Sequence, residues 1–358
     1  MKVSSLGDVI HTLPAVTDAK KANRRLQFDW VVEENFVEIP SWHPAVERVI
    51  PVAFRRWRKG IVQTLRSGEY ADFKKDLQRE HYDLVIDAQG LIKSGIISRL
   101  SKGLTIGLSD STIKEPLATL FYNKVFSVPR EAHAVQRVRE LFSRALNYSL
   151  SEEQLSEIDY GLDLERIGIL PGHVSSGVLL FLHGTTWASK HWPVPFWREL
   201  ARLAVAAGYS VRLPWGNETE RARALAIADG MAAVSVLERQ SLAGMAKQIA
   251  QADGVVAVDT GLGHLAAALA TPAVSLYGPT NPGLSGTFGR QQAQLSSSLP
   301  CAPCMSKTCH YQGAEQLITL GDASLVVSPP CFSSHPPAQV FSVLQQLLAQ
   351  RSLTVAPP

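Results

Sequence analysis

The sequence has no long hydrophobic run, few cysteines and no apolar leader. Its 358 residues contain no uninterrupted stretch of about 18 apolar residues, the length that a membrane-spanning helix requires. The start, Met1-Lys2-Val3-Ser4-Ser5, leads directly into Gly7-Asp8 without the apolar segment of a signal peptide. Four cysteines are too few for a disulfide-stapled scaffold of this size. We therefore expect a cytoplasmic protein whose thiols are reduced unless they bind a metal.

Charge is also sparse, and it is unevenly distributed. Charged residues make up 19% of the chain against 46% hydrophobic residues, with a mean hydropathy of +0.02, which excludes a disordered protein. At about 100–200 residues per domain, the length predicts two domains. Residues 1–150 hold 23 Lys and Arg against 17 Asp and Glu, whereas residues 151–358 hold 12 against 15. A basic first half predicts that an anionic partner binds there, and nucleic acid fits poorly because no nucleic-acid-binding module is recognisable.

Short apolar runs followed by Gly or small polar residues recur along the chain, with helical patterns between them. Continuous apolar strands of this kind are typical of parallel sheets covered by helices on both faces. The runs lie at 28–32, 84–87, 177–182, 210–213, 254–259 and 273–277. We predict an α/β protein with an N-terminal domain at 1–160, a linker at 161–176, a C-terminal domain at 177–335 and a closing helix at 336–350.

The sharpest chemical signal is a glycine-containing turn, Asp259-Thr260-Gly261-Leu262-Gly263-His264, which follows an expected strand and opens a helix of small residues. Free backbone N–H groups and the positive end of a helix dipole suit a phosphate or diphosphate. An ordinary strand-to-helix turn, with Asp259 or Thr260 as a cap, explains the same residues. The Gly-x-Gly-x-x-Gly fingerprint of dinucleotide-binding proteins is absent, which disfavours a nicotinamide-dependent dehydrogenase.

A second loop, His183 to Pro193, follows the expected strand at 177–182. Open α/β sheets bind ligands at the carboxyl ends of their strands, and Lys190 offers a point charge for phosphate oxygens. After the next strand, Glu218 offers a carboxylate for sugar hydroxyls. Glu218 and Glu220 are equally well explained as the first-turn acids of a helix.

In the N-terminal half, Asp8 precedes a helix with apolar periodicity. An Asp at this place is most often an N-cap, but it is also available as a general base if it faces a cleft. The densest basic cluster is Arg55-Arg56-Trp57-Arg58-Lys59, and His133 and Arg137 add charge on another helix. Guanidinium groups bind carboxylates and phosphates at two points, so the cluster indicates either an anionic ligand or a solvated surface.

The C-terminal third contains Cys301-x2-Cys304-x4-Cys309-His310, with Cys331 further on. These thiols are numerous enough for a zinc site, although their spacing is only partly regular. The partial regularity favours the alternative of reduced loop cysteines without a ligand.

Five segments together resemble the bacterial lipopolysaccharide heptosyltransferases. They are residues 4–14, 87–94, 185–192, 259–264 and 277–280. With further similarity at 29–34, 39–43 and 55–59, the resemblance covers nearly all of residues 3–290. It implies a GT-B fold, in which two Rossmann-like domains face each other across a cleft with the acceptor on the N-terminal side and the donor on the C-terminal side. It also implies an inverting transfer of L-glycero-D-manno-heptose from ADP-heptose to a Kdo hydroxyl of Kdo2-lipid A, without a metal or other cofactor.

Carried onto this sequence, the resemblance implies a role for each motif. Asp8 would take the proton of the attacking hydroxyl, and Lys190 would balance charge on the ADP leaving group. The donor would be bound by Thr185, Thr186, Lys190, Glu218 or its rival Glu220, Asp259, Thr260, Gly261 and His264. The acceptor's charged groups would be bound by Arg55, Arg56, Arg58, Lys59, Lys93, Lys114, His133 and Arg137, with Lys114 standing where we expect an arginine.

The resemblance further implies a monomer in peripheral contact with the cytoplasmic face of the bacterial inner membrane, where basic residues meet an anionic lipid acceptor. Two alternatives stay open. One is a relative that uses the same donor with another saccharide acceptor, and the other is a protein that binds nucleotide or glycolipid without catalysis.

Two features depart from the family pattern. Only Met1-Lys2-Val3 precedes the Ser4-Ser5-Leu6-Gly7-Asp8 loop, where the family normally has an apolar strand. Loss of a central strand removes a large apolar contact, so we expect a chain that begins here to be poorly stable. The cysteine-rich segment after residue 296 lies outside the resemblance and receives no function from it.

Overall fold

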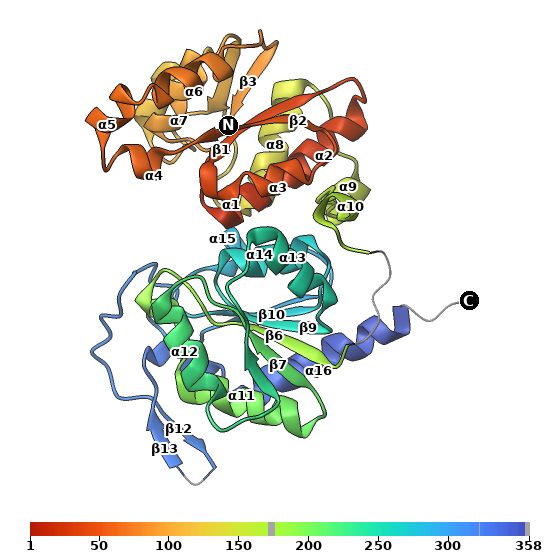
Figure 1. The fold of residues 1–358 in the computed structure, drawn as a ribbon, viewed down its shortest axis with the longest axis vertical. Coiled ribbons are helices and arrows are strands. Elements are labelled where there is room, and N and C mark those ends of the chain that lie inside the picture. The colour runs from red at the N-terminus through yellow and green to blue at the C-terminus, as the bar shows by residue number, and fades with distance from the viewer. Residues whose placement is uncertain (171–175, 322, 355–358) are drawn as a thin grey trace. The chain divides into compact units, whose positions relative to one another are not determined.

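The structure, a computed structural model, describes residues 1–170, 176–321 and 323–354. The chain forms two compact units, Met1–Arg166 and Ile167–Pro358 (Figure 1). Their boundary lies inside the expected linker 161–176, of which residues 171–175 are outside the described part of the chain. Each unit contains parallel strands with helices packed against them.

This boundary corrects the expected division of charge. Residues 151–166 contain six acidic residues and one arginine, and they belong to the first unit. That unit therefore holds 24 Lys and Arg against 23 Asp and Glu, and the second holds 11 against 9. The prediction of a basic half joined to an acidic half is wrong for the folded units, because a cut at residue 150 puts the acidic segment on the wrong side. Recognition of an anion must depend on local clusters of cations.

The second unit is built on a six-stranded parallel sheet with the order β11-β10-β9-β6-β7-β8. The strands are β6 (Val178–Leu182), β7 (Ser210–Leu213), β8 (Val234–Val236), β9 (Gly254–Val258), β10 (Ala273–Tyr277) and β11 (Gln292–Ser296). The chain runs from β6 outward through β7 and β8 and then restarts at β9 on the other side. Loops at the carboxyl ends of the strands at such a switch point form the ligand crevice of doubly wound sheets.

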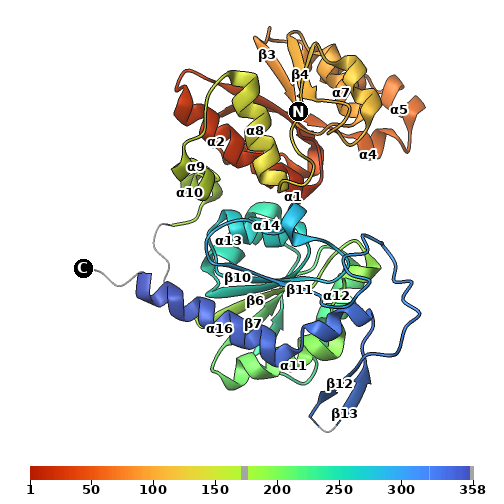
Figure 2. The ribbon, with the colours of Figure 1, turned by 180° about the vertical axis from the view of Figure 1, so that it is seen from behind.

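Helices cover both faces of this sheet (Figure 2). On one face lie α13 (Leu242–Gln251) and α14 (Gly261–Ala268), and on the other lie α11 (Val194–Ala206) and α16 (Pro337–Thr354). The core includes Trp192 and Trp197, which are fully buried with their rings 4.9 Å apart and nearly perpendicular. α16 covers the segment where the closing helix is expected, and it contributes Val340 and Leu344 to the core.

The first unit contains two small parallel sheets. One has the order β1-β2 and the other β3-β4-β5. The strands are β1 (Phe28–Glu33), β2 (Val46–Val52), β3 (Leu84–Asp87), β4 (Leu104–Leu108) and β5 (Lys124–Phe126).

Residues 1–3 lie between β1 and β3, where the family pattern has a full strand. Met1 donates to the carbonyl of Ile86 at 2.7 Å and accepts from the N–H of Ala88 at 3.0 Å. On the other side, the carbonyl of Val3 accepts from Glu33 at 3.0 Å, and the Val3 side chain is fully buried. The two sheets are therefore joined by a three-residue segment, and the poor stability expected from a short central strand stays a prediction.

The helices of the first unit are anchored by α2 (Leu13–Ala22) and α8 (Ala134–Leu146), which pack against each other. Arg139 on α8 is 1% exposed, and its Nε lies 2.6 Å from Oδ2 of Asp18 on α2. This buried ion pair fixes the helix that carries Arg137 near its start.

The remaining elements complete the two units. In the first unit they are α1 (Leu6–Ile10), η1 (Glu34–Phe36), α3 (Glu38–Ser41), α4 (Phe54–Trp57), α5 (Ile61–Arg66), α6 (Glu69–Leu77), α7 (Ile92–Leu100), η2 (Pro116–Phe121) and α9 (Glu152–Ser156). α10 (Leu164–Ile167) lies at the boundary between the units. In the second unit they are η3 (Ala188–Lys190), α12 (Glu218–Ala228), α15 (Pro282–Ser285), β12 (Leu317–Leu320), β13 (Ala323–Val326) and η4 (Pro330–Ser334). Across the described ranges, no helix combines the length and apolar character needed to cross a membrane.

Candidate active site

Three loops of the second unit meet at Asp259, the residue that follows β9. Lys190, in the loop after β6, places its Nζ 2.7 Å from Asp259 Oδ2. Thr280, in the loop after β10, donates its hydroxyl to the same oxygen at 2.8 Å. Thr185 donates to the backbone carbonyl of Asp259 at 3.0 Å. Because β6, β9 and β10 are adjacent in the sheet, these contacts define the crevice at its switch point.

Lys190 is held in a partly buried setting. Its side chain is 15% exposed, and its ammonium group lies 4.2 Å from the centre of the Trp187 ring. An ammonium group has three protons to donate. Lys190 can therefore keep its pairing with Asp259 while it donates to the oxygens of a phosphate.

The start of α14 adds backbone groups to this crevice. Thr260 is the N-cap and Gly261 the first helical residue. Gly263 packs closely, since a Cβ on it would lie 3.4 Å from Ala257 Cβ, and His264 is 6% exposed. The N-terminus of α14 is half-buried, and its free backbone N–H groups favour an anion.

The two rival glutamates are placed differently. The side chain of Glu218 is 78% exposed and lies 3.5 Å from Arg221. Glu220 instead turns back over the loop after β7, where its Oε2 accepts from the N–H of Gly216 at 2.7 Å. Its carboxyl carbon lies 2.8 Å from the position of a Cβ on Gly184, so the Glu220 carboxylate lies directly against the loop after β6. Glu220 is the better placed of the two to reach a ligand in the crevice.

In the first unit, Asp8 is the third residue of α1, and Ser5 is its N-cap. The expectation that Asp8 itself caps the helix is therefore corrected. The N–H and hydroxyl of Ser5 donate to Asp8 Oδ2 at 2.8 and 2.9 Å, and Lys2 Nζ lies 3.7 Å from Oδ1. The Asp8 side chain is still 42% exposed, so the same carboxylate stabilises the helix start and faces solvent.

The charge state of Asp8 suits a proton acceptor. Burial acts to raise its pKa, but the positive charges of Lys2 and Lys114 and the hydrogen bonds from Ser5 outweigh burial and lower the pKa below its usual value. The carboxylate is therefore ionised at neutral pH, the state in which it can accept a proton.

The loop that carries Asp8 is fixed by residues to which the sequence assigns no role. Gln89 Oε1 accepts the N–H groups of Val3 and Ser4 at 2.9 and 3.0 Å. Asp87 is fully buried and accepts from the hydroxyl of Tyr122 at 2.7 Å. The sequence could have indicated both residues, since Asp87 ends the run 84–87 and Gln89 follows it closely.

Arg56, an expected acceptor residue, is already paired. Its guanidinium lies 2.9 Å from Glu34 and 2.6 Å from Glu69. The hydrogen bonds that Arg56 donates to these carboxylates raise the Arg56 pKa and lower that of Glu69. The charge of Arg56 is balanced within the unit, unlike the charges of its neighbours Arg58 and Lys59, which are exposed.

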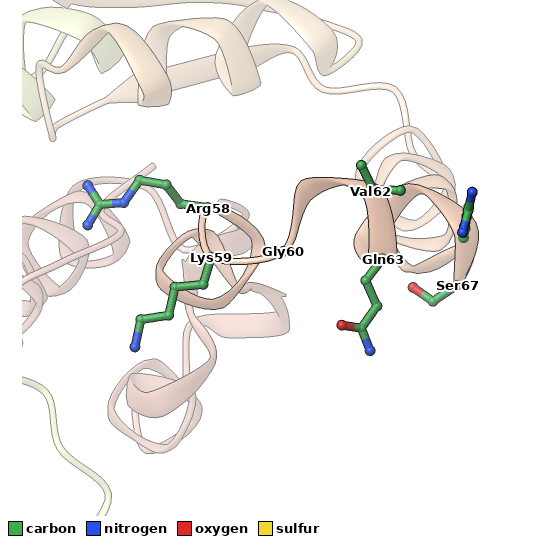
Figure 3. A pocket seen from close by; sticks show the side chains of 7 residues that line it. Arg58, Lys59, Gly60, Val62, Gln63 and Ser67 are labelled. Atoms are coloured by element: carbon green, nitrogen blue, oxygen red, sulfur yellow. The ribbon is translucent and has the colours of Figure 1, made fainter.

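Two hollows in the first unit collect most of the remaining expected cations. One, of about 640 Å³, is lined by Ser4, Phe54, Arg55, Trp57, Arg58, Thr64, Tyr70 and Lys93. The other, of about 830 Å³, is lined by Arg58, Lys59, Gly60, Val62, Gln63, Arg66 and Ser67 (Figure 3). Figure 3 shows Arg58 and Lys59 on one helical turn and Gln63 on the next helix. Cations beside aromatic rings suit a ligand with both anionic groups and apolar surface.

The other expected acceptor residues surround the loop before Lys114. His133 is the N-cap of α8, because its Nδ1 accepts from the N–H of Val135 at 3.2 Å. Arg137 donates to the carbonyl of Thr112 at 2.6 Å. Both residues therefore have structural roles, whereas Lys114 is exposed, and its positive charge helps to lower the pKa of Asp8.

The cysteines are free thiols, with Cys301, Cys304 and Cys309 exposed and Cys331 buried. Burial, together with the three neighbouring thiols, raises the pKa of Cys331 to about 12. Among the residues that the structure describes, no three His, Cys, Asp or Glu side chains are grouped as metal ligands.

Comparison with known proteins decides the family. A family model described as glycosyltransferase family 9 (heptosyltransferase) matches residues 70–315. The chain is 54% identical over 350 residues to a Pseudomonas aeruginosa protein named Lipopolysaccharide heptosyltransferase 1, a match that covers 97% of each chain. The chain belongs to glycosyltransferase family 9.

Solved structures of family 9 relatives agree with this assignment. The Escherichia coli heptosyltransferase WaaC with ADP is 48% identical, with a TM-score of 0.77 over 82% of this chain and 91% of that chain. The same E. coli protein with ADP-2-deoxy-2-fluoro heptose is 46% identical, with a TM-score of 0.75 over 83% and 91%. The predicted GT-B fold and glycosyltransferase class are confirmed, and the chain is an enzyme of the heptosyltransferase family.

For this family 9 enzyme, the structure adds Thr280 to the residues that contact Asp259. The resemblance includes the segment Tyr277-Gly278-Pro279-Thr280, but it assigns no role to the threonine. Its position three residues after the end of a buried strand is the sequence feature that could have indicated it. The roles of Asp8, Lys190 and the other site residues stay predictions.

Proposed function

We propose that this family 9 enzyme transfers L-glycero-D-manno-heptose from ADP-heptose to a Kdo hydroxyl of Kdo2-lipid A during assembly of the lipopolysaccharide inner core. The hydroxyl oxygen bonds to the anomeric carbon while the bond from that carbon to the diphosphate oxygen breaks. ADP leaves, the configuration at the anomeric carbon inverts, and Asp8 takes the proton of the hydroxyl.

The observation that carries the proposal is the convergence of Lys190, Thr280 and Thr185 on Asp259 at the switch point of the second unit's sheet. A preorganised cation beside a helix N-terminus stabilises the charge that develops on a departing diphosphate. The E. coli relative was solved with ADP and with a fluorinated ADP-heptose, which supports the same donor for this chain.

The first unit supplies what the acceptor requires. Kdo carries a carboxylate and lipid A carries phosphates, and guanidinium groups bind both. Arg58 and Lys59 line the larger hollow of this unit, and Arg58 and Lys93 line the smaller one together with aromatic side chains. Asp8 lies on the same unit, with its carboxylate partly exposed and ionised.

We further propose that the enzyme contacts an anionic membrane through η2 and α7, which pack against each other. Leu117 and Leu120 on η2 are 63% and 78% exposed, and Ile96 on α7 is 44% exposed. Lys93 and Arg99 flank Ile96 on α7, so exposed apolar side chains lie beside positive charge. This combination suits an anionic lipid surface, and it lies on the unit that is proposed to bind the lipid acceptor.

The acceptor assay tests the function directly. Purified enzyme is incubated with ADP-heptose and either Kdo2-lipid A or an acceptor that already carries heptose, and the products are identified by mass spectrometry. Heptose added only to Kdo2-lipid A supports the proposal, whereas transfer only to the heptosylated acceptor contradicts it. Donor binding without any product would favour a non-catalytic protein.

A further inference from the structure

The cysteine-rich segment contacts the back of the donor crevice. Ser189, next to Lys190, is 2% exposed, and its hydroxyl donates to the carbonyl of Ser306 at 2.6 Å. The N–H of Ser189 donates to the carbonyl of Lys307 at 3.1 Å. Met305 donates its N–H to the carbonyl of Pro279, next to Thr280, at 2.8 Å. Residues 305–307 therefore join the loop after β6 to the loop after β10.

The end of the same segment joins these two loops again. His335 is 1% exposed, and its carbonyl accepts from Trp192 Nε1 at 3.2 Å. Its ring Nε2 lies 3.2 Å from the carbonyl of Tyr277, the last residue of β10. Because Trp192 comes two residues after Lys190, this second connection spans the same pair of loops as the first.

The end of the cysteine-rich segment is packed into the core of the second unit. Phe332 is fully buried, and Cys331 belongs to the same apolar cluster. A Cβ on Gly278 would lie 2.7 Å from Cys331 Sγ and 3.1 Å from the Phe332 ring, so the segment lies directly against the start of the loop after β10. Contacts this close leave little freedom for the two surfaces to slide.

We infer that residues 305–307 and His335 form a bracket that sets the position of Lys190 against Asp259, with Ser189 as the positioning residue through which the bracket acts. Lys190 and Thr280 reach the same oxygen of Asp259 from the two bracketed loops, so any separation of these loops breaks one of the two contacts. A charge that stabilises a leaving group must be held in place before the reaction begins. The inference depends on the proposed function, because it requires that Lys190 contacts the donor. It gives the cysteine-rich segment a role that the family resemblance does not supply.

Ser189→Ala tests the bracket because it removes the hydroxyl contact and leaves the backbone contact to Lys307. We expect kcat/KM for ADP-heptose to fall about fivefold, the scale of one buried hydrogen bond, with the KM for the acceptor unchanged. Ser101→Ala is the matched control, since the Ser101 hydroxyl donates to the Ser98 carbonyl at 2.6 Å and the residue is 7% exposed in the first unit. Both variants should lose similar thermal stability. An unchanged kcat/KM for the donor in Ser189→Ala would overturn the inference.

A double-mutant cycle with Lys190→Ala separates the bracket from the proposed function. If Lys190→Ala alone leaves donor kinetics and ADP binding unchanged, the donor role of Lys190 fails, and the inference that depends on it fails with it. If Lys190→Ala weakens both, Ser189→Ala should cause no further loss in that background, because Ser189 acts through Lys190. An equal fivefold loss in both backgrounds would show that Ser189 acts independently, and would overturn the bracket while leaving the proposed function intact.

Discussion

The two units position their charged residues in different ways. In the second unit, the Asp259 carboxylate is contacted from the loops of the two strands that flank its own, and its partner Lys190 is only 15% exposed. In the first unit, Arg58 and Lys59 are exposed at the edges of open hollows. Partly buried charges interact strongly, whereas exposed ones are screened and individually weak. A diphosphate can therefore be bound by a few fixed groups, while a large acceptor with several anionic groups can be bound by many weak contacts.

The largest effect should come from replacing Asp8. It would separate the chemical role of Asp8 from the acceptor-binding roles proposed for other residues of the first unit. Asp8→Ala should lower kcat about 10²–10⁴-fold, the contribution of a general base. ADP-heptose binding, measured by calorimetry, should be retained because the proposed donor residues belong to the other unit. Asp8→Asn is the matched control, since its amide oxygen still accepts from Ser5 but cannot take the proton. Near-normal turnover in Asp8→Ala would reduce Asp8 to a helix-stabilising residue.

The next effect should distinguish the cations of the first unit from one another. Arg58→Ala should raise the KM for the acceptor about tenfold, because it removes an exposed charge that can form a charge-assisted hydrogen bond. Arg56→Ala should change that KM little, since Arg56 is paired with Glu34 and Glu69. The acceptor KM of both variants is measured at saturating ADP-heptose. Equal increases would contradict the distinction drawn from these ion pairs.

The units also differed in how well the sequence predicted them. β6, β7, β9 and β10 were predicted, because β6, β9 and β10 are buried along their whole length and β7 is buried at alternate residues. β8 has only three residues and β11 carries exposed polar residues, so neither produces an apolar run. In the first unit, only β1 and β3 were predicted, since β2 and β5 are partly exposed and the apolar run of β4 is interrupted by a threonine and a glycine.

The site was predictable where motifs follow strands, and less so where partners are distant in sequence. Asp259 and Lys190 were expected near the donor from their positions after β9 and β6. The pairing of Arg56 with Glu34, 22 residues away, leaves no mark in the sequence around either residue. The choice between Glu218 and Glu220 likewise depends on the space left by Gly184, more than 30 residues earlier in the chain. Such contacts depend on tertiary structure, which local patterns do not contain.

A smaller effect is expected on membrane binding. It tests whether the contact with the membrane is made by the first unit and not by the second. The double variant Leu117→Ser and Leu120→Ser should bind vesicles containing phosphatidylglycerol about fivefold more weakly. Each leucine side chain that enters the lipid surface contributes favourable transfer free energy, and the serines do not. Leu225→Ser is the control, because Leu225 is 51% exposed on the second unit. Sedimentation with anionic and with neutral vesicles measures the binding. Equal losses for both leucine variants would place the contact elsewhere.

The smallest effect concerns the pH dependence of Asp8. Because its pKa is lowered, the carboxylate is active above that pKa, and activity is lost only as the pH falls through it. Ser5→Ala removes the hydroxyl donor and leaves the N–H donor, so the pKa should rise and the acid limb of kcat/KM should move up by about half a pH unit. The rate at pH 7 should hardly change, since Asp8 remains ionised there. Ser41→Ala, which removes a hydroxyl that donates to the carbonyl of Glu38 at 2.7 Å, should leave the limb in place. A limb that stays unchanged or moves to lower pH in Ser5→Ala would show that the Ser5 hydroxyl does not stabilise the reactive carboxylate.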